Sequence, residues 1–129
     1  MKIINRRLSN DEGGIFLIIS NKDVQVKKTG NKTSRKVLVA GNKIMMVEFH
    51  FAKGGIGSLH KHSDHEQIGY VAKGSFEITV GNETKFAKQG DCYYAAKNIL
   101  HGVVALEEDS ILVDSFTPLR EDFLTSSDD

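Results

Sequence analysis

Residues 54–74 read GGIGSLHKHSDHEQIGYVAKG and hold three of the five histidines of the chain between glycine-rich ends. In a β-strand, residues two apart project from the same face, so His60 and His62 can direct both imidazoles at one point while Lys61 faces away. Two imidazoles alone do not complete a metal site. This histidine pair therefore predicts half of such a site, which needs further ligands from later residues.

Candidates for those ligands stand at the starts of two later apolar runs. Gln67 opens one run, and His101 opens the run HGVVAL. Glu66 competes with Gln67, because a carboxylate is the more usual ligand and both residues lie at a permitted spacing from His62. Residue chemistry alone leaves both open. His65 lies in the turn before them, where we expect it to be solvated.

Composition limits the class of protein. The chain has 129 residues, with 17 basic against 17 acidic ones, so it is one domain by size with a formal net charge of zero. No broad basic field exists for nucleic acid or anionic lipid, and a small uncharged or locally held anionic partner fits better. The single Cys92 excludes an internal disulfide and is expected to be buried, and the start MKIINRR lacks the apolar core of a signal peptide. We predict a cytoplasmic protein that binds neither nucleic acid nor membrane.

Short alternating segments predict an all-β barrel or sandwich. Residues 36–40 and 44–51 read as one hairpin, and residues 75–80 turn through Gly81-Asn82 into 83–87 as a second. Further strands are expected at 92–95, 101–106 and 110–116. Regular short strands with glycine or asparagine turns and little helical periodicity are typical of such folds.

The domain is expected to occupy residues 34–124. Residues 1–33 read as a polar leader whose strand-like pieces, 15–19 and 24–26, could extend a sheet edge or a dimer interface. Residues 125–129 are expected to fray.

Several strands carry apolar residues on both faces. Ile68 and Tyr70 oppose Val71, and Ile111 opposes Leu112. A small barrel has one interior, so its second apolar face must be covered by something. The leader could cover it in cis, and a second subunit could cover it in trans. We predict a homodimer.

The central stretch resembles the first cupin motif, which runs glycine, five residues, His-x-His, three or four residues, Glu or a substitute, six residues, glycine. The matching residues, in order, are Gly54, His60, His62, Gln67 and Gly74. Counting six residues back from Gly74 selects Gln67 and not its neighbour. The resemblance implies a single-domain cupin, which is an all-β double-stranded β-helix or jelly-roll barrel.

The second cupin motif runs glycine, five residues, Pro-x-Gly, two residues, His, three residues, Asn. Gly90 and His101 match it, whereas Ala96-Lys97-Asn98 stands at Pro-x-Gly and Ala105 at Asn. The metal ligands that the resemblance implies are His60, His62, Gln67 and His101. Three imidazoles and one neutral carboxamide suit one divalent transition metal ion, and their chemistry does not choose among Zn, Ni, Fe, Mn and Co.

The ending DSFTPLREDFL, residues 114–124, narrows the likeness. With the first motif and HGVVA, it resembles the small cupins of pectin and alginate degradation, the KdgF type. Members of that group convert 4,5-unsaturated monouronates, released by polysaccharide lyases, into linear deoxy-keto uronates, and they use a metal held by three histidines and a glutamine. By position, the acid/base aspartate, the aromatic and the arginine of that family fall on Asp114, Phe116 and Arg120.

The residue types suit these roles. Asp114 and Phe116 share one strand face with Leu112, so the carboxyl would be desolvated and hold its proton tightly; the alternative is an exposed or turn-capping aspartate. Arg120 offers a planar fork for a uronate carboxylate, or it pairs with a neighbouring acid at the surface.

The resemblance implies a metal-dependent, isomerase-like enzyme acting on a small anionic sugar. Two other classes stay open, because one fold serves many functions. A mostly histidine shell with open positions also suits a metal-dependent dioxygenase. A non-catalytic sugar-binding cupin would bind its ligand without turnover.

Overall fold

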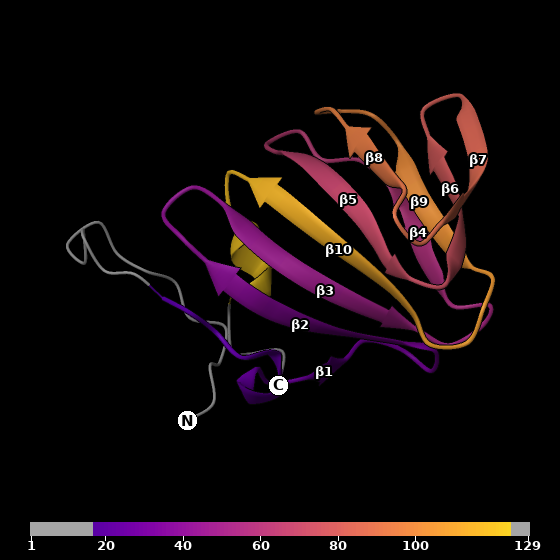
Figure 1. Ribbon diagram of the computed structural model, residues 1–129. Coiled ribbons are helices and arrows are strands. Elements are labelled where there is room, and N and C mark those ends of the chain that lie inside the picture. The colour runs from indigo at the N-terminus through magenta and orange to yellow at the C-terminus, as the bar shows by residue number, and fades with distance from the viewer. Residues whose placement is uncertain (1–16, 125–129) are drawn as a thin grey trace.

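The computed structural model describes residues 17–124, which form two antiparallel β-sheets packed face to face (Figure 1). In spatial order, the six-stranded sheet consists of β1 (Lys27–Lys28), β2 (Thr33–Ala40), β3 (Met45–Phe51), β10 (Ser110–Thr117), β5 (Glu66–Lys73) and β8 (Cys92–Ala95). The four-stranded sheet consists of β4 (Ile56–His60), β9 (His101–Ala105), β6 (Ser75–Val80) and β7 (Glu83–Lys88). This is the all-β jelly-roll barrel that the sequence predicts.

The helices among these residues are two short 3-10 turns, η2 (Asn21–Asp23) and η3 (Glu121–Phe123). Neither is long or apolar enough to cross a membrane.

Both predicted hairpins are present, as β2–β3 and β6–β7. The leader differs from the prediction. In place of a strand at 24–26, Val24 makes an isolated bridge and the strand follows at β1, which pairs with β2. Residues 17–19 of the predicted strand 15–19 form no strand, and residues 15, 16 and 125–129 lie outside the described residues.

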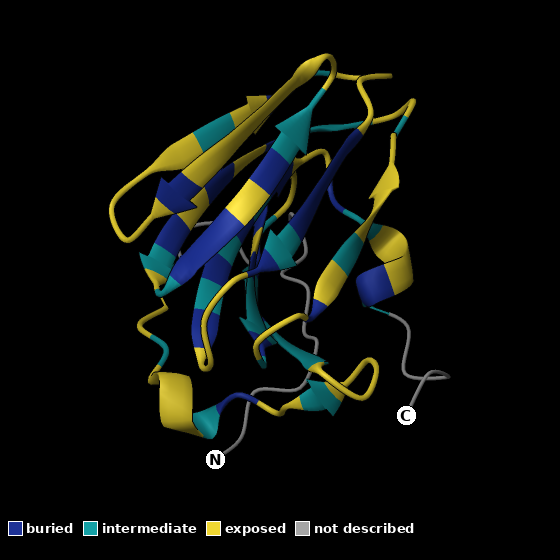
Figure 2. Ribbon diagram, turned by 90° about the vertical axis from the view of Figure 1, so that its right-hand side faces the viewer, coloured by how far each residue is buried: buried dark blue, intermediate teal, exposed yellow. Residues whose placement is uncertain are grey.

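β10 lies in the middle of the six-stranded sheet and pairs with β3 on one side and β5 on the other. Its inward residues are Ser110, Leu112, Asp114 and Phe116, which are all buried, and they alternate with less buried outward residues. Burial alternates in the same way along the neighbouring β5, where Gln67, Gly69 and Val71 are buried, and buried segments also face the interior on other strands (Figure 2). This two-residue period brings Asp114 into the barrel interior.

One apolar cluster lies between the two sheets, and a second packs β2, β3 and β10 against the segment that carries Leu119 and Phe123. One contains Val71 and Phe76, the other contains Val47 and Phe116, and all four side chains are at most 1% exposed. Phe49 packs against both clusters. At roughly 1.5–3 kcal/mol for each large apolar side chain that is fully buried, these clusters supply most of the driving force for folding.

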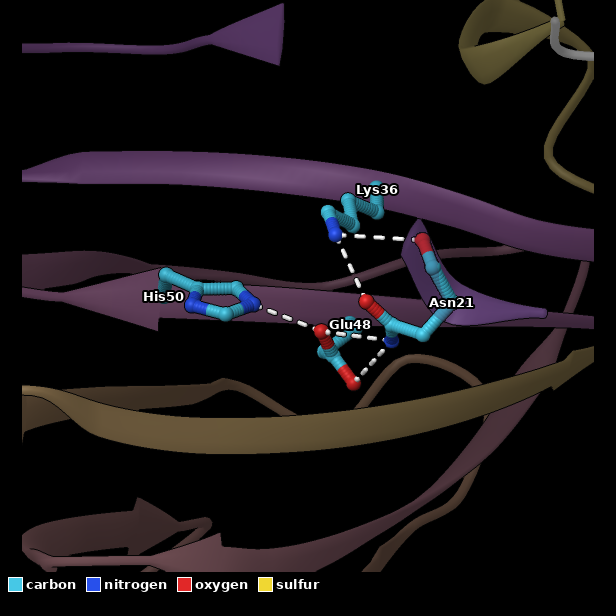
Figure 3. A network of polar contacts seen from close by, with 4 residues as sticks. All are labelled: Asn21, Lys36, Glu48 and His50. Carbon is cyan, nitrogen blue, oxygen red and sulfur yellow. Dashed lines mark hydrogen bonds and ion pairs between the residues drawn. The ribbon is translucent and has the colours of Figure 1, made fainter. Parts of the chain in front are cut away.

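A polar network fastens η2 to the outer face of β2 and β3 (Figure 3). Lys36 Nζ donates to Asn21 Oδ1 at 2.6 Å and to the Asn21 carbonyl oxygen at 3.2 Å. Asn21 Nδ2 in turn donates to both carboxylate oxygens of Glu48 at 3.1 Å, and His50 Nε2 contacts Glu48 Oε1 at 2.6 Å. The segment before β1 therefore covers this part of the outer face in cis.

Candidate metal centre and catalytic pocket

Three histidines meet where β4 ends and β9 begins. His60 is the last residue of β4 and His101 the first of β9, and the two residues are register partners. His62 follows in the loop after β4. One ring nitrogen of each histidine lies within 4.8 Å of those of the other two. Imidazoles at this separation can bind a single metal ion.

Backbone hydrogen bonds orient two of these imidazoles. Nδ1 of His60 lies 2.6 Å from the carbonyl oxygen of Ser58, and Nδ1 of His101 lies 2.9 Å from that of Ile99. A ring whose Nδ1–H donates to a carbonyl presents the lone pair of Nε2. Nε2 of His101 and Nε2 of His62 are buried and have no hydrogen-bond partner among residues 17–124, which fits metal-binding atoms.

Burial favours the neutral form of two of these imidazoles. Desolvation lowers the pKa of His62 from 6.5 to about 4, and the positive charge of Arg120 adds to the effect. Desolvation also lowers the pKa of His101, although the hydrogen bond to the Ile99 carbonyl opposes it. Neutral imidazoles offer their lone pairs at pH 7, so the cluster can accept a cation.

Gln67 supplies a fourth candidate donor from the inner face of β5. Its Nε2 donates to the hydroxyl oxygen of Tyr93 at 2.7 Å and to Asp114 Oδ2 at 3.3 Å. Its Oε1 is buried and has no hydrogen-bond partner in the described part of the chain. Glu66 lies on the outer face, where its carboxylate accepts a hydrogen bond from Tyr94 at 2.7 Å. Gln67, and not Glu66, therefore lines the same cavity as His60 and His101.

Asp114 is a buried carboxyl in the middle of β10, not a turn cap. The Tyr93 hydroxyl donates to its Oδ1 at 2.9 Å. Burial raises the pKa of Asp114 from 3.8 to about 7, although the Tyr93 hydrogen bond and the charge of Arg120 oppose the rise. A carboxyl with this pKa can take up and release a proton near neutral pH.

Arg120 faces the cavity and is also paired. Its Nη2 lies 2.8 Å from Asp122 Oδ2, as expected for an arginine beside a surface acid. Its guanidinium also stacks 3.8 Å above the ring of Phe123 and lies 5.7 Å from that of Phe116. Cation–π contacts with two aromatic rings hold the guanidinium beside the cavity, and Asp122 pairs with its charge.

These side chains line one cavity of about 110 Å³. Its polar residues are His60, Gln67, Tyr93, His101, Asp114 and Arg120, and its apolar walls include Phe49, Leu112 and Phe116. The walls come from both apolar clusters, so the cavity lies where the clusters meet. The structure thus brings the predicted site residues together: His62 belongs to the histidine cluster, and the others line the cavity.

The weakly matching second motif keeps its geometry. Asn98, which stands where the motif has glycine, has a φ of 65°. Asparagine adopts this left-handed conformation more readily than other residues with a side chain. The N–H of Asn98 donates to the carbonyl oxygen of His62 at 2.7 Å, so the turn before His101 holds the loop that carries His62.

Two residues lie differently from the prediction. His65 is not a solvated turn residue: its Nε2 is buried, and its ring centroid lies 4.3 Å from that of His62 and 6.0 Å from that of Phe116. Cys92 is exposed, because it lies on the outer face of the edge strand β8. Both surroundings are formed by residues distant in sequence or by the sheet edge, which local patterns do not reveal.

Tyr93 is the site residue that the sequence analysis missed. It joins Gln67 to Asp114 through two hydrogen bonds inside the cavity. A sequence signal exists in Gly69, a glycine inside a strand, which often marks a place where another group approaches the backbone closely.

Comparisons with known proteins agree with this geometry. Residues 47–116 match the cupin domain. The pectin degradation protein KdgF of Dickeya dadantii (strain 3937) is 51% identical over 98 residues, which are 76% of this chain and 89% of that protein. KdgF from Halomonas sp. has a solved structure with 34% identity and a TM-score of 0.83, matching 85% of this chain and 100% of that one. A solved RmlC-like cupin from Shewanella frigidimarina has 32% identity and a TM-score of 0.76, with 81% and 92% covered.

The chain belongs to the cupin family, as its jelly-roll barrel and the match to the cupin domain establish. Within that family it belongs with the small KdgF-type cupins.

Proposed function

We propose that this protein is a metal-dependent enzyme that converts 4,5-unsaturated monouronates into linear deoxy-keto uronates. The observation that carries the proposal is a buried carboxyl, Asp114, whose pKa of about 7 suits proton transfer and which lines the same cavity as two of the clustered histidines and Arg120. The likeness to a protein named for pectin degradation supports the choice of substrate.

The metal would be held by His60, His62, Gln67 and His101. Three clustered imidazoles and the unpartnered, buried Oε1 of Gln67 fit one divalent transition ion. Such an ion supplies Lewis acidity, which polarises a substrate oxygen. The donor set is neutral, so the full charge of the ion would be available to an anionic sugar.

The reaction is an isomerisation that one carboxyl can serve. As the ring opens, the anomeric hydroxyl loses its proton, the bond between the anomeric carbon and the ring oxygen breaks, and the anomeric carbon becomes an aldehyde. The ring oxygen stays on its other carbon as an enol oxygen and becomes a ketone oxygen when the second carbon of the former double bond gains a proton. In this scheme Asp114 accepts the first proton and returns one to that carbon, so no net proton, oxidant or reductant is needed.

Arg120 and Phe116 would position the substrate. The guanidinium of Arg120 can bind the uronate carboxylate, as it binds the exposed carboxylate of Asp122 in this structure. Phe116 and the other aromatic walls exclude water from the reacting atoms.

The test is to incubate the purified protein with unsaturated galacturonate and follow ultraviolet absorbance. Loss of the conjugated double bond lowers the absorbance, so we expect a fast, metal-dependent decrease without oxygen consumption. A decrease no faster than the uncatalysed rate would remove this function. Oxygen uptake would indicate a dioxygenase, and tight binding without turnover a sugar-binding cupin.

A further inference from the structure

Gln67, Tyr93 and Asp114 come from three neighbouring strands, β5, β8 and β10, and form a closed ring of hydrogen bonds. The Gln67 amide N–H groups donate to the Tyr93 oxygen at 2.7 Å and to Asp114 Oδ2 at 3.3 Å. The Tyr93 hydroxyl donates to Asp114 Oδ1 at 2.9 Å. Every donor in the ring has an acceptor. The amide oxygen Oε1 of Gln67 takes no part in these hydrogen bonds.

Gly69 provides the space for this ring. In the sheet register Gly69 is the partner of both Tyr93 on β8 and Asp114 on β10. A Cβ atom on Gly69 would lie 1.9 Å from Tyr93 Cε2 and 2.6 Å from Asp114 Oδ1. The Tyr93 ring therefore crosses β5 at the place where a side chain is missing. Gly69 is not among the residues with positive φ, so close approach, and not backbone conformation, requires glycine here.

We propose that Tyr93, reaching across Gly69, is a positioning residue that fixes the Gln67 amide with its NH₂ toward Asp114 and its Oε1 toward the imidazoles. An amide turned end for end would place its oxygen against the Asp114 carboxylate, where two acceptors face each other. The inference rests on the metal-binding part of the proposed function and assigns this chain a residue that controls its fourth ligand.

The ring also explains why an amide stands where a carboxylate is the more usual ligand. A carboxylate at position 67 would have no hydrogen to donate and would bring a second negative charge to within about the 3.3 Å that now separates Gln67 Nε2 from Asp114 Oδ2. The chain gives up the stronger charge–metal attraction at this ligand and keeps Asp114 paired.

The first test compares Tyr93→Phe with Tyr94→Phe, which removes the adjacent hydroxyl on the outer face. Affinity for Co²⁺ is measured by competition with a chelator of known affinity. We expect Tyr93→Phe to bind Co²⁺ about ten-fold or more weakly, as for other groups that orient a metal ligand, and Tyr94→Phe to bind as the wild type does. Gly69→Ala should weaken binding likewise, although it removes no hydrogen-bonding group. Equal affinities for the two tyrosine variants would overturn the proposal.

The second test needs neither metal nor substrate. In the metal-free protein at pH 8, the effect of Asp114→Asn on the unfolding equilibrium is measured in the wild-type and Gln67→Glu backgrounds. Asp114→Asn removes a repulsive pair of carboxylates only in the Gln67→Glu background. The change that it causes in the unfolding equilibrium constant should therefore differ between the two backgrounds by about ten-fold or more. The matched pair Glu66→Gln and Asp114→Asn should show no coupling. Additive effects at positions 67 and 114 would overturn the inference, whereas a wild type that binds no Co²⁺ would instead refute the proposed metal function.

Discussion

The inner and outer faces of β5, β8 and β10 carry similar polar groups in different surroundings. On the inner face, Tyr93 donates to Asp114 and accepts from Gln67. On the outer face, Tyr94 donates to Glu66 at 2.7 Å. The inner group is buried, which raises the pKa of Asp114 to about 7, whereas the outer pair is exposed to water.

The difference teaches that the face of the strand, more than the residue type, decides which polar groups can do chemistry. Val71 and Leu112 are buried on the inner face, and their burial fixes the register of β5 and β10. A slip of one residue would exchange Gln67 for Glu66 and Asp114 for a neighbour. The alternation that builds the apolar core therefore also selects the residues that line the cavity.

Replacing Asp114 should give the largest difference between the faces. Asp114→Asn keeps an acceptor for Tyr93 but cannot exchange a proton, so kcat on unsaturated galacturonate should fall by about 10²–10⁴-fold. Metal content, measured by elemental analysis, should fall far less. The outer-face variant Ser115→Ala should keep both the kcat and the metal content of the wild type. An active Asp114→Asn enzyme would contradict the assigned role.

Removing a proposed metal ligand should lower the metal content of the protein whether or not substrate is present. His101→Ala removes the ligand supplied from outside the central stretch and should lose at least as much metal as Gln67→Ala. Glu66→Ala should keep its metal, because its side chain faces the other side of the sheet. Elemental analysis of identically purified variants measures the difference. Metal lost from Glu66→Ala but retained in Gln67→Ala would mean that Glu66, and not Gln67, is the ligand.

The buried carboxyl should also make the metal-free protein sensitive to pH. The pKa of Asp114 is raised in the folded state, so the folded state binds more protons than the unfolded state between about pH 4 and pH 7. This carboxyl alone therefore lowers the free energy of unfolding as pH rises through this window, whereas the lowered pKa values of His62 and His101 act in the opposite direction. The contribution of Asp114 is the difference between the wild type and Asp114→Asn, and we expect it to be on the order of 3 kcal/mol. Urea unfolding of both proteins at pH 4.5 and pH 8 measures this difference. An equal change in the free energy of unfolding in the two proteins would contradict the burial effect.

The outer face should matter least for the site and most for assembly. Ile68, Tyr70 and Tyr94 are exposed there, on β5 and β8, which β10 separates from the strands that η2 covers. We expect a second copy of the chain to cover them, since adjacent apolar side chains on one sheet face favour association. Ile68→Glu should then give a monomer in sedimentation with unchanged metal content. A wild-type monomer at micromolar concentration would contradict the dimer.

Local patterns predicted the parts of this protein that depend on strand period and motif spacing. The alternation along β10 placed Asp114 on one face with Leu112 and Phe116, and cupin spacing selected Gln67 over Glu66 and joined His101 to His60. The hairpins followed from their turns for the same reason: the residues that decide them are close in sequence.

The remaining features depend on contacts between distant segments. Tyr93 enters the site through its register with Gly69, 24 residues earlier in the chain, and no local pattern specifies that pairing. His65 is partly buried and contacts Phe116, which comes from β10. Asn98 replaces a motif glycine because the backbone needs a left-handed residue there, a requirement of conformation that a comparison of residue types does not reveal.

The central place of β10 has a consequence for synthesis on the ribosome. β3 and β5 both leave the ribosome before β10, and each pairs with it along one edge. The hairpin β2–β3 can form early, but the six-stranded sheet keeps two open edges until residues 110–117 emerge. Every proposed metal ligand precedes that strand, whereas Asp114 is part of it. A nascent chain thus carries all of its proposed metal ligands before it has a closed cavity or the proposed acid–base group.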